Sequence, residues 1–396
     1  MRAAVVGSGV AGMAAATALA RRGHAVTLFE AFDRPRPLGS GLLLQPSGLS
    51  ALRALDLAEP VLALGARIDR LDGRDPAGRR IMDMRYADWR AGSFGLGVHR
   101  ASLFGVLHQA LAPAGVEVRT GVRVVGVDDA GGRPLLRDAA GATHGPFHLA
   151  VLADGSASLL RAGLRPRARA PVYPWGAVWA NARDHDGVFA GALHQRYRRA
   201  STMAGILPIG RGPDSADRLV SFFWSLPAAQ LDGFLAGDLE GWRAQAAALW
   251  PDARKIIDQL TSTGMFAPAT YRDVQVGRWS LGATVLIGDA AHGTSPQLGQ
   301  GANLALVDAV ELAERLTPAV TQSLVRFQAA RRRHTAVYQL ASRWLTPLFQ
   351  SAGPVGPLVR DLLFTPLSKA PGLRRLAAIV LTGGFRLGRT PPRLRP

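Results

Sequence analysis

The chain contains no cysteine among its 396 residues, and only two of its 47 basic residues are lysines, Lys255 and Lys369. Without cysteine the protein has no disulfide, no thiolate nucleophile and no cysteine-based metal site. No apolar run approaches the roughly 18 residues that a membrane span needs. The first predicted strand begins at residue 3, which leaves no room for a signal peptide before it. We therefore expect a cytoplasmic protein.

Acidic residues are scarce as well, because 29 of them stand against 47 basic ones and give a formal net charge of +18. Such an excess could attract nucleic acid, a membrane surface or an anionic cofactor. The arginines are scattered and are not interleaved with aromatic residues on one face, as a nucleic-acid site requires. We expect a solvated basic surface and no nucleic-acid partner. Hydrophobic residues make up 48% of the chain, which predicts a globular protein.

A glycine triplet lies near the start of the chain. Gly7, Gly9 and Gly12 stand between an apolar strand and an alanine-rich helix, and the next predicted strand ends in Glu30. In such a βαβ unit the first glycine allows a tight turn, the second lets the backbone approach a pyrophosphate, and the third lets helix and strand pack closely. The helix N-terminus adds free amides for the phosphates, and Glu30 can accept hydrogen bonds from ribose hydroxyls. A glycine-rich turn in an unrelated α/β protein is the alternative.

A second glycine-centred segment follows almost 280 residues later. Gly288 and Asp289 follow an apolar strand, and Pro296 and a Gly-Gln-Gly turn over 299–301 precede a helix. A helix N-terminus aimed at the pyrimidine edge of a flavin would stabilise the negative charge of the reduced ring. A cofactor held by two such distant segments is a resident FAD rather than a passing NAD.

Periodicity and turn residues divide the chain into three parts. The pattern predicts an α/β fold with a discontinuous, Rossmann-like FAD-binding domain, an inserted antiparallel β-sheet domain, and a helical C-terminal tail. The predicted boundaries are 1–64, 99–170 and 272–343 for the first domain, 65–98 and 171–271 for the second, and 344–396 for the tail. The predicted strands cover 3–6, 25–30, 116–119, 122–127, 149–153, 175–182, 191–197, 203–208, 218–226 and 284–287, and the predicted helices cover 10–22, 47–57, 102–111, 235–250 and 301–316.

Four patterns in a fixed order resemble the group A flavoprotein monooxygenases. They are the glycine triplet with Glu30, the segment His99–Leu103, DGxxSxxR over 154–161, and GDAAH…P…GQGAN over 288–303. On local grounds alone, Asp-Gly is equally well explained as a simple turn. Members of this family are single-component, FAD-dependent hydroxylases with the para-hydroxybenzoate hydroxylase fold, and the resemblance covers roughly residues 1–340. It implies an FAD site that includes Gly7, Gly9, Val10, Ala11, Gly12, Glu30, Ala31, Arg36, Gly41, Arg100, Val124, Asp154, Gly155, Gly288, Asp289, Pro296, Gly299, Gln300, Gly301, Ala302 and Asn303.

The resemblance also implies roles within that site. Arg100 would reach the phosphate or ribityl region, the backbone near Val124 would meet the adenine, and Asp289 would bind ribityl and pyrophosphate. The segment 36–42 would pass near the isoalloxazine, and residues 299–303 would meet the flavin ring. Asp154 and Gly155 serve both FAD and the nicotinamide in the family.

The chemistry that the family implies has three parts. NADH or NADPH reduces the flavin, dioxygen forms a flavin hydroperoxide, and its distal oxygen is transferred to an electron-rich substrate. The protein must exclude water from the hydroperoxide, which fits an inserted sheet rich in aromatic residues. We therefore expect hydroxylation or epoxidation of an aromatic or polycyclic, largely apolar small molecule.

The inserted sheet supplies candidates for the substrate pocket, although ordinary core packing explains each of its aromatic residues at least as well. The candidates are Trp175, Trp179, Leu207, Pro208, Phe222 and Trp224. His194 and Tyr197 could bond or deprotonate a phenol, but a structural role is the favoured interpretation of both. No catalytic side chain is assigned with certainty, because the flavin carries the reaction.

Several alternatives stay open at the level of sequence. An FAD-dependent reductase of the isoprenoid-reductase type is the main one; a flavin-dependent halogenase and a non-enzymatic FAD protein are weaker. The stretch 373–387 combines apolar residues with arginines. It could lie on a membrane or cap an apolar channel, but a helix packed on the sheet domain is favoured. The sequence leaves open NADH against NADPH, and a monomer against a homodimer.

Overall fold

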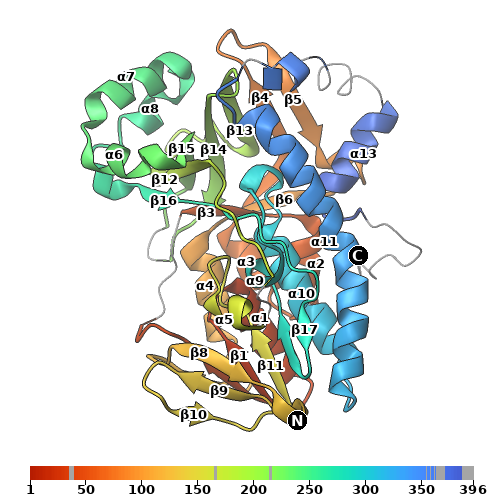
Figure 1. The fold of residues 1–396 in the computed structure, drawn as a ribbon. Helices are drawn as coiled ribbons and strands as arrows, with labels where there is room; N and C mark the ends of the chain where they lie inside the picture. The colour runs from red at the N-terminus through yellow and green to blue at the C-terminus, as the bar shows by residue number, and fades with distance from the viewer. Residues whose placement is uncertain are drawn as a thin grey trace.

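A six-stranded sheet forms one end of the molecule in the computed structural model of the chain (Figure 1). Its strand order is β17-β18-β11-β1-β2-β7, and every pairing except that of β17 with β18 is parallel. The bounds are β1 Arg2–Val6, β2 Ala25–Phe29, β7 Glu117–Arg119, β11 Leu149–Leu152, β17 Ser280–Leu281 and β18 Thr284–Leu286. The structure describes residues 1–34, 40–164, 167–213, 216–353, 355–356, 358–360, 362 and 371–385.

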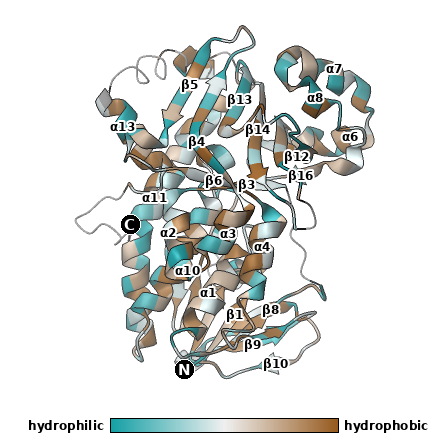
Figure 2. Ribbon diagram, turned by 180° about the vertical axis from the view of Figure 1, so that it is seen from behind, coloured by the Kyte–Doolittle hydropathy of each residue, from teal (hydrophilic) through white to brown (hydrophobic). Residues whose placement is uncertain are grey.

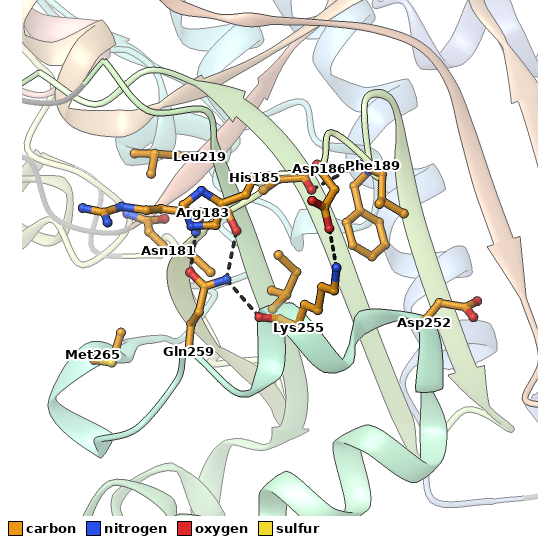
Figure 3. Close-up of a pocket in the computed structure, with 14 residues that line it drawn as sticks. Asn181, Arg183, His185, Asp186, Phe189, Leu219, Asp252, Lys255, Gln259 and Met265 are labelled. Atoms are coloured by element: carbon orange, nitrogen blue, oxygen red, sulfur yellow. Dashed lines mark hydrogen bonds and ion pairs between the residues drawn. The ribbon is translucent and has the colours of Figure 1, made fainter.

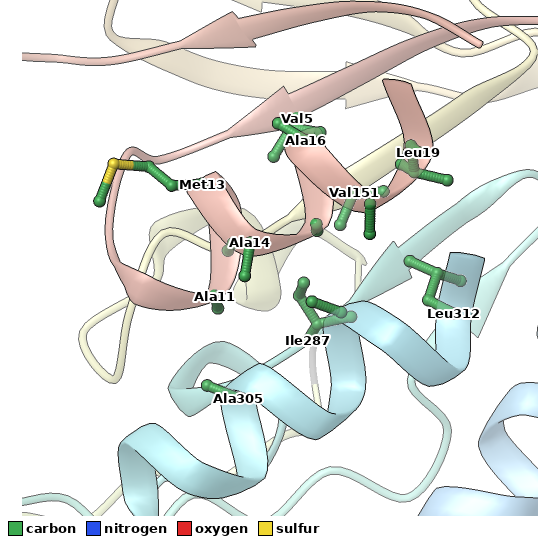
Figure 4. Close-up of a cluster of buried hydrophobic side chains, with 14 of the residues drawn as sticks. Val5, Ala11, Met13, Ala14, Ala16, Leu19, Val151, Ile287, Ala305 and Leu312 are labelled. Carbon is green, nitrogen blue, oxygen red and sulfur yellow. The ribbon is translucent and has the colours of Figure 1, made fainter. Parts of the chain in front are cut away.

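Helices pack on this parallel sheet, and their small residues set how closely they approach. In α1 (Val10–Ala20), nine consecutive residues from Ala11 to Leu19 are buried, so this helix has no polar face. It packs against α10 (Gly301–Arg315), and Figure 4 shows Ala11 and Ala14 of α1 near Ala305 of α10. The other helices of this part are α2 Pro46–Ala54, α3 Ala58–Leu64, α4 Arg100–Gln109, α5 Leu159–Leu164 and α9 Asp289–His292.

A small antiparallel sheet, ordered β10-β9-β8, lies beside the parallel one. Its strands are β8 Val124–Asp128, β9 Leu135–Asp138 and β10 Thr143–His144. The sequence predicted only the first of these strands, because β9 and β10 are short and flanked by polar residues.

A nine-stranded, largely antiparallel sheet forms the other end of the molecule. Its order is β16-β12-β15-β14-β13-β4-β6-β3, with β5 paired to β4, and β13 runs parallel to β4. The bounds are β3 Gly41–Leu44, β4 Ala66–Arg74, β5 Arg80–Arg85, β6 Gly95–His99, β12 Trp175–Arg183, β13 Gly191–Arg198, β14 Thr202–Gly210, β15 Leu219–Pro227 and β16 Ala267–Ala269.

Side chains alternate between the two faces of this sheet. Three helices cover one face, which we call the outer face: α6 (Leu231–Ala236), α7 (Leu239–Leu249) and α8 (Arg254–Ile257). Val178, Ala180 and Ile206 of the sheet pack into a hydrophobic core with these helices. The inner face is the opposite one.

The single helix predicted over 235–250 is wrong in detail, because the extended backbone of Gly237 (φ −88°, ψ 179°) separates α6 from α7.

Further helices lie in the C-terminal part of the chain. α11 (Val320–Phe349) is a single helix that runs from the parallel sheet towards the antiparallel one, and α13 (Pro371–Leu381) packs near β5 and the short helix η1 (Tyr86–Asp88). In Figure 2, hydrophilic residues recur along α11 at the edge of the molecule, whereas β14 in its interior is predominantly hydrophobic. The remaining 3-10 helices are η2 Ala130–Gly132, η3 Ala228–Gln230, η4 Pro251–Ala253, η5 Thr263–Met265 and η6 Pro296–Leu298. Among the described residues, no helix is both long and apolar enough to cross a bilayer.

Gly12 provides a test of the close packing at the start of α1. A Cβ atom at this position would overlap the carbonyl oxygen of Gly7 in the preceding turn. We expect Gly12→Ala to lower the free energy of unfolding by about 1–3 kcal/mol, because the turn or the helix must move. The matched control is Gly105→Ala in α4, where the new methyl group meets nothing within 4 Å. Urea unfolding should show the control to be as stable as the wild type, or up to about 1 kcal/mol more stable. Equal stability of the two variants would contradict the packing argument.

Candidate functional site

Four segments that are far apart in sequence meet at the carboxyl edge of the parallel sheet. Gly7 follows β1, Glu30 follows β2, Asp154 follows β11 and Gly288 follows β18. The amide of Gly7 donates to Phe29 (2.8 Å) and the amide of Ile287 donates to Leu152 (3.0 Å), so the strands end level with one another. The carboxyl ends of parallel strands are where α/β proteins bind nucleotides.

Within the glycine triplet, open space for an anion lies only at Gly9, next to free main-chain amides. Gly7 has φ +99° and a Cβ atom there would meet the carbonyl oxygen of Ala153 at 2.6 Å, whereas a Cβ atom on Gly9 would meet nothing within 4 Å. The first bond of α1 runs from Met13 to Gly9 (3.0 Å), so the amides of residues 10–12 have no acceptor within the helix. Open space beside free amides fits the pyrophosphate of FAD.

Glu30 is held in a fixed orientation at the neighbouring strand end. Its side chain is buried and accepts hydrogen bonds from the amides of Ser8 (2.8 Å) and Phe32 (3.0 Å), and from the Ser8 hydroxyl. The sequence did not single out Ser8, although a serine inside a buried glycine turn is a signal for such a bond. Ala31 follows directly and is half-buried.

Asp154 lies where β11 ends and is half-buried. One of its carboxylate oxygens, Oδ1, has no hydrogen-bond partner among the described residues, and burial raises the pKa of Asp154 above its usual range. The guanidinium of Arg161 donates to the carbonyls of Ser156 (2.8 Å) and Ala290 (3.2 Å). This arginine therefore ties the Asp154-Gly155 turn to the segment that begins at Gly288.

The segment from Gly288 to Asn303 presents main-chain amides. Asp289 is exposed at the start of α9, and Gly288 directly before it has φ +59°. The first bond of α10 runs from Leu304 to Gln300 (2.8 Å), which leaves the amides of residues 301–303 without an acceptor in the helix. Pro296 opens η6, and Gly299 follows that helix with φ +59°. These free amides fit the anionic edge of a reduced flavin.

Asn303 holds the backbone in place and does not direct its side chain into open space. It is fully buried; its Oδ1 accepts from the amide of Gln45 (2.8 Å), and its Nδ2 donates to the carbonyls of Leu43 (3.1 Å) and Gly299 (2.8 Å). The side chain thus fastens β3 and α2 to the N-terminus of α10.

A buried ionic network lies directly behind this segment. Asp308 accepts from the amide of Gly288 (2.9 Å), from Nε2 of His292 (2.6 Å) and from Nε of Arg331 (2.6 Å). Burial alone would raise the pKa of Asp308, but the charges and hydrogen bonds of His292 and Arg331 hold it well below its usual range. Asp308 and Arg331 were not predicted as site residues. An acidic residue in the apolar run of α10 is the signal that could have found the first of them.

Other predicted cofactor residues lie on elements outside the parallel sheet. Arg100 begins α4, is exposed, and its amide donates to Ser40 (2.9 Å). Val124 begins β8 and is buried. Gly41 begins β3, where a Cβ atom would come within 2.8 Å of Ser221. Arg36 lies outside the described residues.

The inner face of the large sheet combines aromatic and polar side chains. The rings of Trp179 and Phe223 lie 4.7 Å apart, and Nε1 of Trp179 donates to the hydroxyl of Tyr271 (3.2 Å). Burial raises the pKa of Tyr271 to about 12, so its hydroxyl stays protonated at neutral pH. Ser40 donates to Asn181 and lies 2.7 Å from the hydroxyl of Ser221. Nδ2 of Asn181 lies 2.9 Å from Nε2 of His99, whose pKa is lowered by burial.

Three of the predicted pocket residues have their side chains on the other face, since Pro208 pairs with Val220 of the outer core and Phe222 and Trp224 belong to that core. Phe222 and Trp224 pack against Trp242 of α7, with ring centres 5.9 and 6.0 Å apart. The sequence placed the correct strand but chose the face occupied by the helical cover, and Phe223 between them points inward. Trp175 is buried on the same side as Trp179, Leu207 packs with Leu43 in a separate cluster, and Pro208 lies next to Leu207 in β14.

His194 and Tyr197 lie on opposite faces of β13. His194 contacts Phe189 (5.6 Å between ring centres) on the outer face and lies 3.9 Å from Asp72; burial lowers its pKa. Tyr197 is on the inner face and donates to Gln195 (2.8 Å); its ring centre lies 5.4 Å from that of Phe349 of α11, with the rings tilted by 52°. Burial raises the pKa of Tyr197. Because the side chains of His194 and Tyr197 lie on opposite faces of the sheet, they do not meet at one site.

A cavity of about 630 Å³ lies elsewhere, between the end of β12 and α8 (Figure 3). Arg183, Asp186 and Lys255 line it, and Nζ of Lys255 lies 2.6 Å from the carboxylate of Asp186. None of the four cofactor segments contributes to its lining, so the cavity and the candidate cofactor site are separate. Asn181 is the one residue of the polar inner-face group that also borders the cavity, among the described residues.

Asp308→Asn tests the ionic network. The variant leaves the buried guanidinium of Arg331 without a counter-charge, and we expect it to lose about 3–5 kcal/mol of unfolding free energy at pH 7. Because the pKa of Asp308 is depressed in the folded protein, its contribution is complete above about pH 4 and fades as the pH falls further. Urea unfolding at several pH values measures both effects.

The control for that comparison is Asp258→Asn, which removes the exposed ion pairs with Arg243 and Arg254. It should cost less than about 1 kcal/mol. A cost for Asp308→Asn no greater than that of the control would mean that Asp308 does not stabilise the network.

Comparison with known proteins agrees with this geometry. The FAD binding domain family matches residues 1–339. The chain is 32% identical over 364 residues to a kynurenine 3-monooxygenase of Xanthomonas campestris, covering 85% of this chain and 76% of that protein. It is 28% identical over 341 residues to the aurachin C monooxygenase/isomerase of Stigmatella aurantiaca, covering 83% and 84%.

The solved structures with a similar fold include HpxO of Klebsiella pneumoniae in complex with FAD and uric acid. The TM-score is 0.81 at 22% identity, covering 97% of this chain and 96% of that one. Several relatives by sequence are named monooxygenases or hydroxylases, and they do not support the reductase alternative. The chain belongs to the FAD binding domain family, and within it to the group A FAD-dependent aromatic monooxygenases.

Proposed function

We propose that this protein inserts one oxygen atom from dioxygen into an aromatic or polycyclic, largely apolar small molecule, with NADH or NADPH as reductant. The observation that carries the proposal is the convergence of Gly9, Glu30, Asp289 and the N-terminus of α10 at one sheet edge, below an aromatic sheet face. The relatives support the ring-containing substrate class, since one is named for kynurenine and another for aurachin C. We expect the enzyme to act in the cytoplasm, as a monomer or a homodimer.

The main chain would do most of the cofactor binding. Amides of residues 10–12 would bind the pyrophosphate, Glu30 the ribose, and Asp289 the ribityl chain. Amides of residues 301–303 would face the pyrimidine edge of the ring, where they stabilise negative charge. Asp154-Gly155, Arg100 and the backbone at Val124 would complete the site. When bound, FAD supplies the acceptor for hydride and the centre that activates dioxygen.

The inner face of the large sheet would bind the substrate. The rings of Trp179 and of the buried Phe223, tilted by 38° to each other, make this part of the face aromatic, which suits a ring-shaped substrate and keeps water away. The amide of Asn181 and the hydroxyl of Tyr271 lie beside these rings and can orient a polar substituent. The protonated state of Tyr271 makes it a hydrogen-bond donor at neutral pH.

The test is a screen of phenols, anilines, indoles and quinolone-like compounds with the FAD-loaded protein. A substrate should stimulate NAD(P)H oxidation and dioxygen consumption together, and its product should gain one oxygen atom by mass. A product that gains two hydrogens and no oxygen, or a complete absence of stimulated turnover over a broad panel, would refute the proposal.

Gly9→Val tests the cofactor assignment separately from the fold. Because a Cβ atom on Gly9 meets nothing in the protein, the unfolding temperature of the apo-protein should stay close to that of the wild type. The larger side chain would occupy the place of the pyrophosphate, and the FAD dissociation constant should rise by at least about tenfold. Fluorescence titration of apo-protein with FAD measures it. Unchanged affinity would show that the pyrophosphate lies elsewhere.

Phe223→Leu and Phe222→Leu form a matched pair for the substrate face. Loss of the inward ring should raise the substrate KM by about 2- to 10-fold, because an aromatic contact contributes about 0.5–1.5 kcal/mol. Loss of the outward ring, which packs on Trp242, should lower stability and leave KM unchanged. The reverse pattern in steady-state kinetics would assign the substrate to the outer face.

A further inference from the structure

A turn near the C-terminus reaches back to the candidate flavin site. After α13 the chain turns at Thr382 and Gly383, with φ +81° at the glycine. The carbonyl of Leu381 accepts from Nε2 of Gln300 (2.6 Å), and the carbonyl of Thr382 accepts from the amide of Ser47 (3.1 Å). All three residues of the turn, 381–383, are buried.

These two bonds reach the N-terminal ends of α10 and α2. Gln300 is the residue before α10, so its orientation affects the free amides of residues 301–303. Ser47 lies in the first turn of α2, directly after β3. Gln300 is only 2% exposed, and its Oε1 has no hydrogen-bond partner among the described residues. The contact with Leu381 is therefore the side-chain bond that holds Gln300.

The same turn is joined to the buried ionic network. Nη1 of Arg331 donates to Nδ1 of His334 (2.6 Å), which leaves the proton of this ring on Nε2, and Nε2 donates to the carbonyl of Gly383 (2.9 Å). Arg331 also binds Asp308, whose carboxylate accepts from the amide of Gly288. One continuous chain of buried bonds thus connects Gly288, at the start of the flavin segment, with the C-terminal turn.

An ion pair holds α13 in place from outside. Arg374 donates to both carboxylate oxygens of Asp88 in η1, at 2.7 to 3.1 Å. Leu381 packs in a cluster that includes Leu43 of β3 and Tyr86 of η1. The turn is therefore a docked part of the fold, although it lies beyond residues 1–339, which match the family.

We propose that the turn 381–383 is a positioning element of the flavin site, acting through Gln300. It fixes the N-terminus of α10, whose amides stabilise negative charge on the reduced ring. This inference rests on the assignment of FAD to this site. If the turn is displaced, FAD should bind more weakly and its two-electron midpoint potential should fall, because the reduced, anionic form loses stabilisation.

Gly383→Ala and Gly372→Ala make a matched test in the full-length protein. A Cβ atom on Gly383 would overlap the hydroxyl of Ser47 and would require an unfavourable positive φ, whereas on Gly372, in the first turn of α13, it meets nothing within 4 Å. Gly383→Ala should raise the FAD dissociation constant by about tenfold. It should also lower the midpoint potential and alter the visible spectrum of the bound flavin. Gly372→Ala should match the wild type in all three.

Gln300→Leu is the second variant, and it removes the bond to Leu381 without backbone strain. It should shift the midpoint potential in the same direction as Gly383→Ala. If both variants lose thermal stability but keep the wild-type potential and spectrum, the turn has only a structural role and the inference is wrong. A protein that binds FAD and shows these shifts, but oxidises no aromatic substrate, would refute the proposed function and leave this inference standing.

Discussion

The candidate site depends on the carboxylate of Asp308, which is fully buried between three segments. A buried charge is tolerated only when its partners are complete, and here an amide, an imidazole and a guanidinium supply them. Asp308 lies on the same helix as the free amides of residues 301–303, about 10 Å along its axis. The carboxylate therefore sets the position of the Gly288 turn relative to the N-terminus of α10, which are the two parts that would hold the flavin half of the cofactor.

Main chain and side chains have different tasks at this site. The groups available to a ligand are largely amides at the starts of α1 and α10, and small residues leave them accessible. The polar side chains are mostly occupied within the protein: Glu30 binds Ser8 and Phe32, and Asn303 binds three backbone groups. Substitution of a side chain such as Asn303 would thus act on the cofactor through the backbone.

The sequence predicted the parallel sheet edge well, and for a physical reason. Each of Gly7, Asp154 and Gly288 follows a short apolar strand, and such strands are parallel when helices separate them. The prediction of which β15 side chains face the substrate pocket was wrong, because Phe222, Phe223 and Trp224 are consecutive. A strand buried on both sides has no polar alternation, so only the position of α7 decides which ring faces the site. The bond from Gln300 to Leu381 was also beyond prediction, because it joins residues 81 positions apart with no local pattern.

The two faces of the antiparallel sheet can change independently. The outer face is closed by α6–α8, and its aromatic core, centred on Trp242, is complete without the other face. The inner face meets the end of α11 through Tyr197 and Phe349 and carries the polar group around Asn181. Substitutions at inward positions such as Trp179 and Phe223 would therefore change the face proposed to bind the substrate, while the outer core would keep the sheet folded. The edge of the parallel sheet around Gly7 and Gly288 would keep its geometry. In the proposed function, this separation would let one cofactor site act on different ring systems.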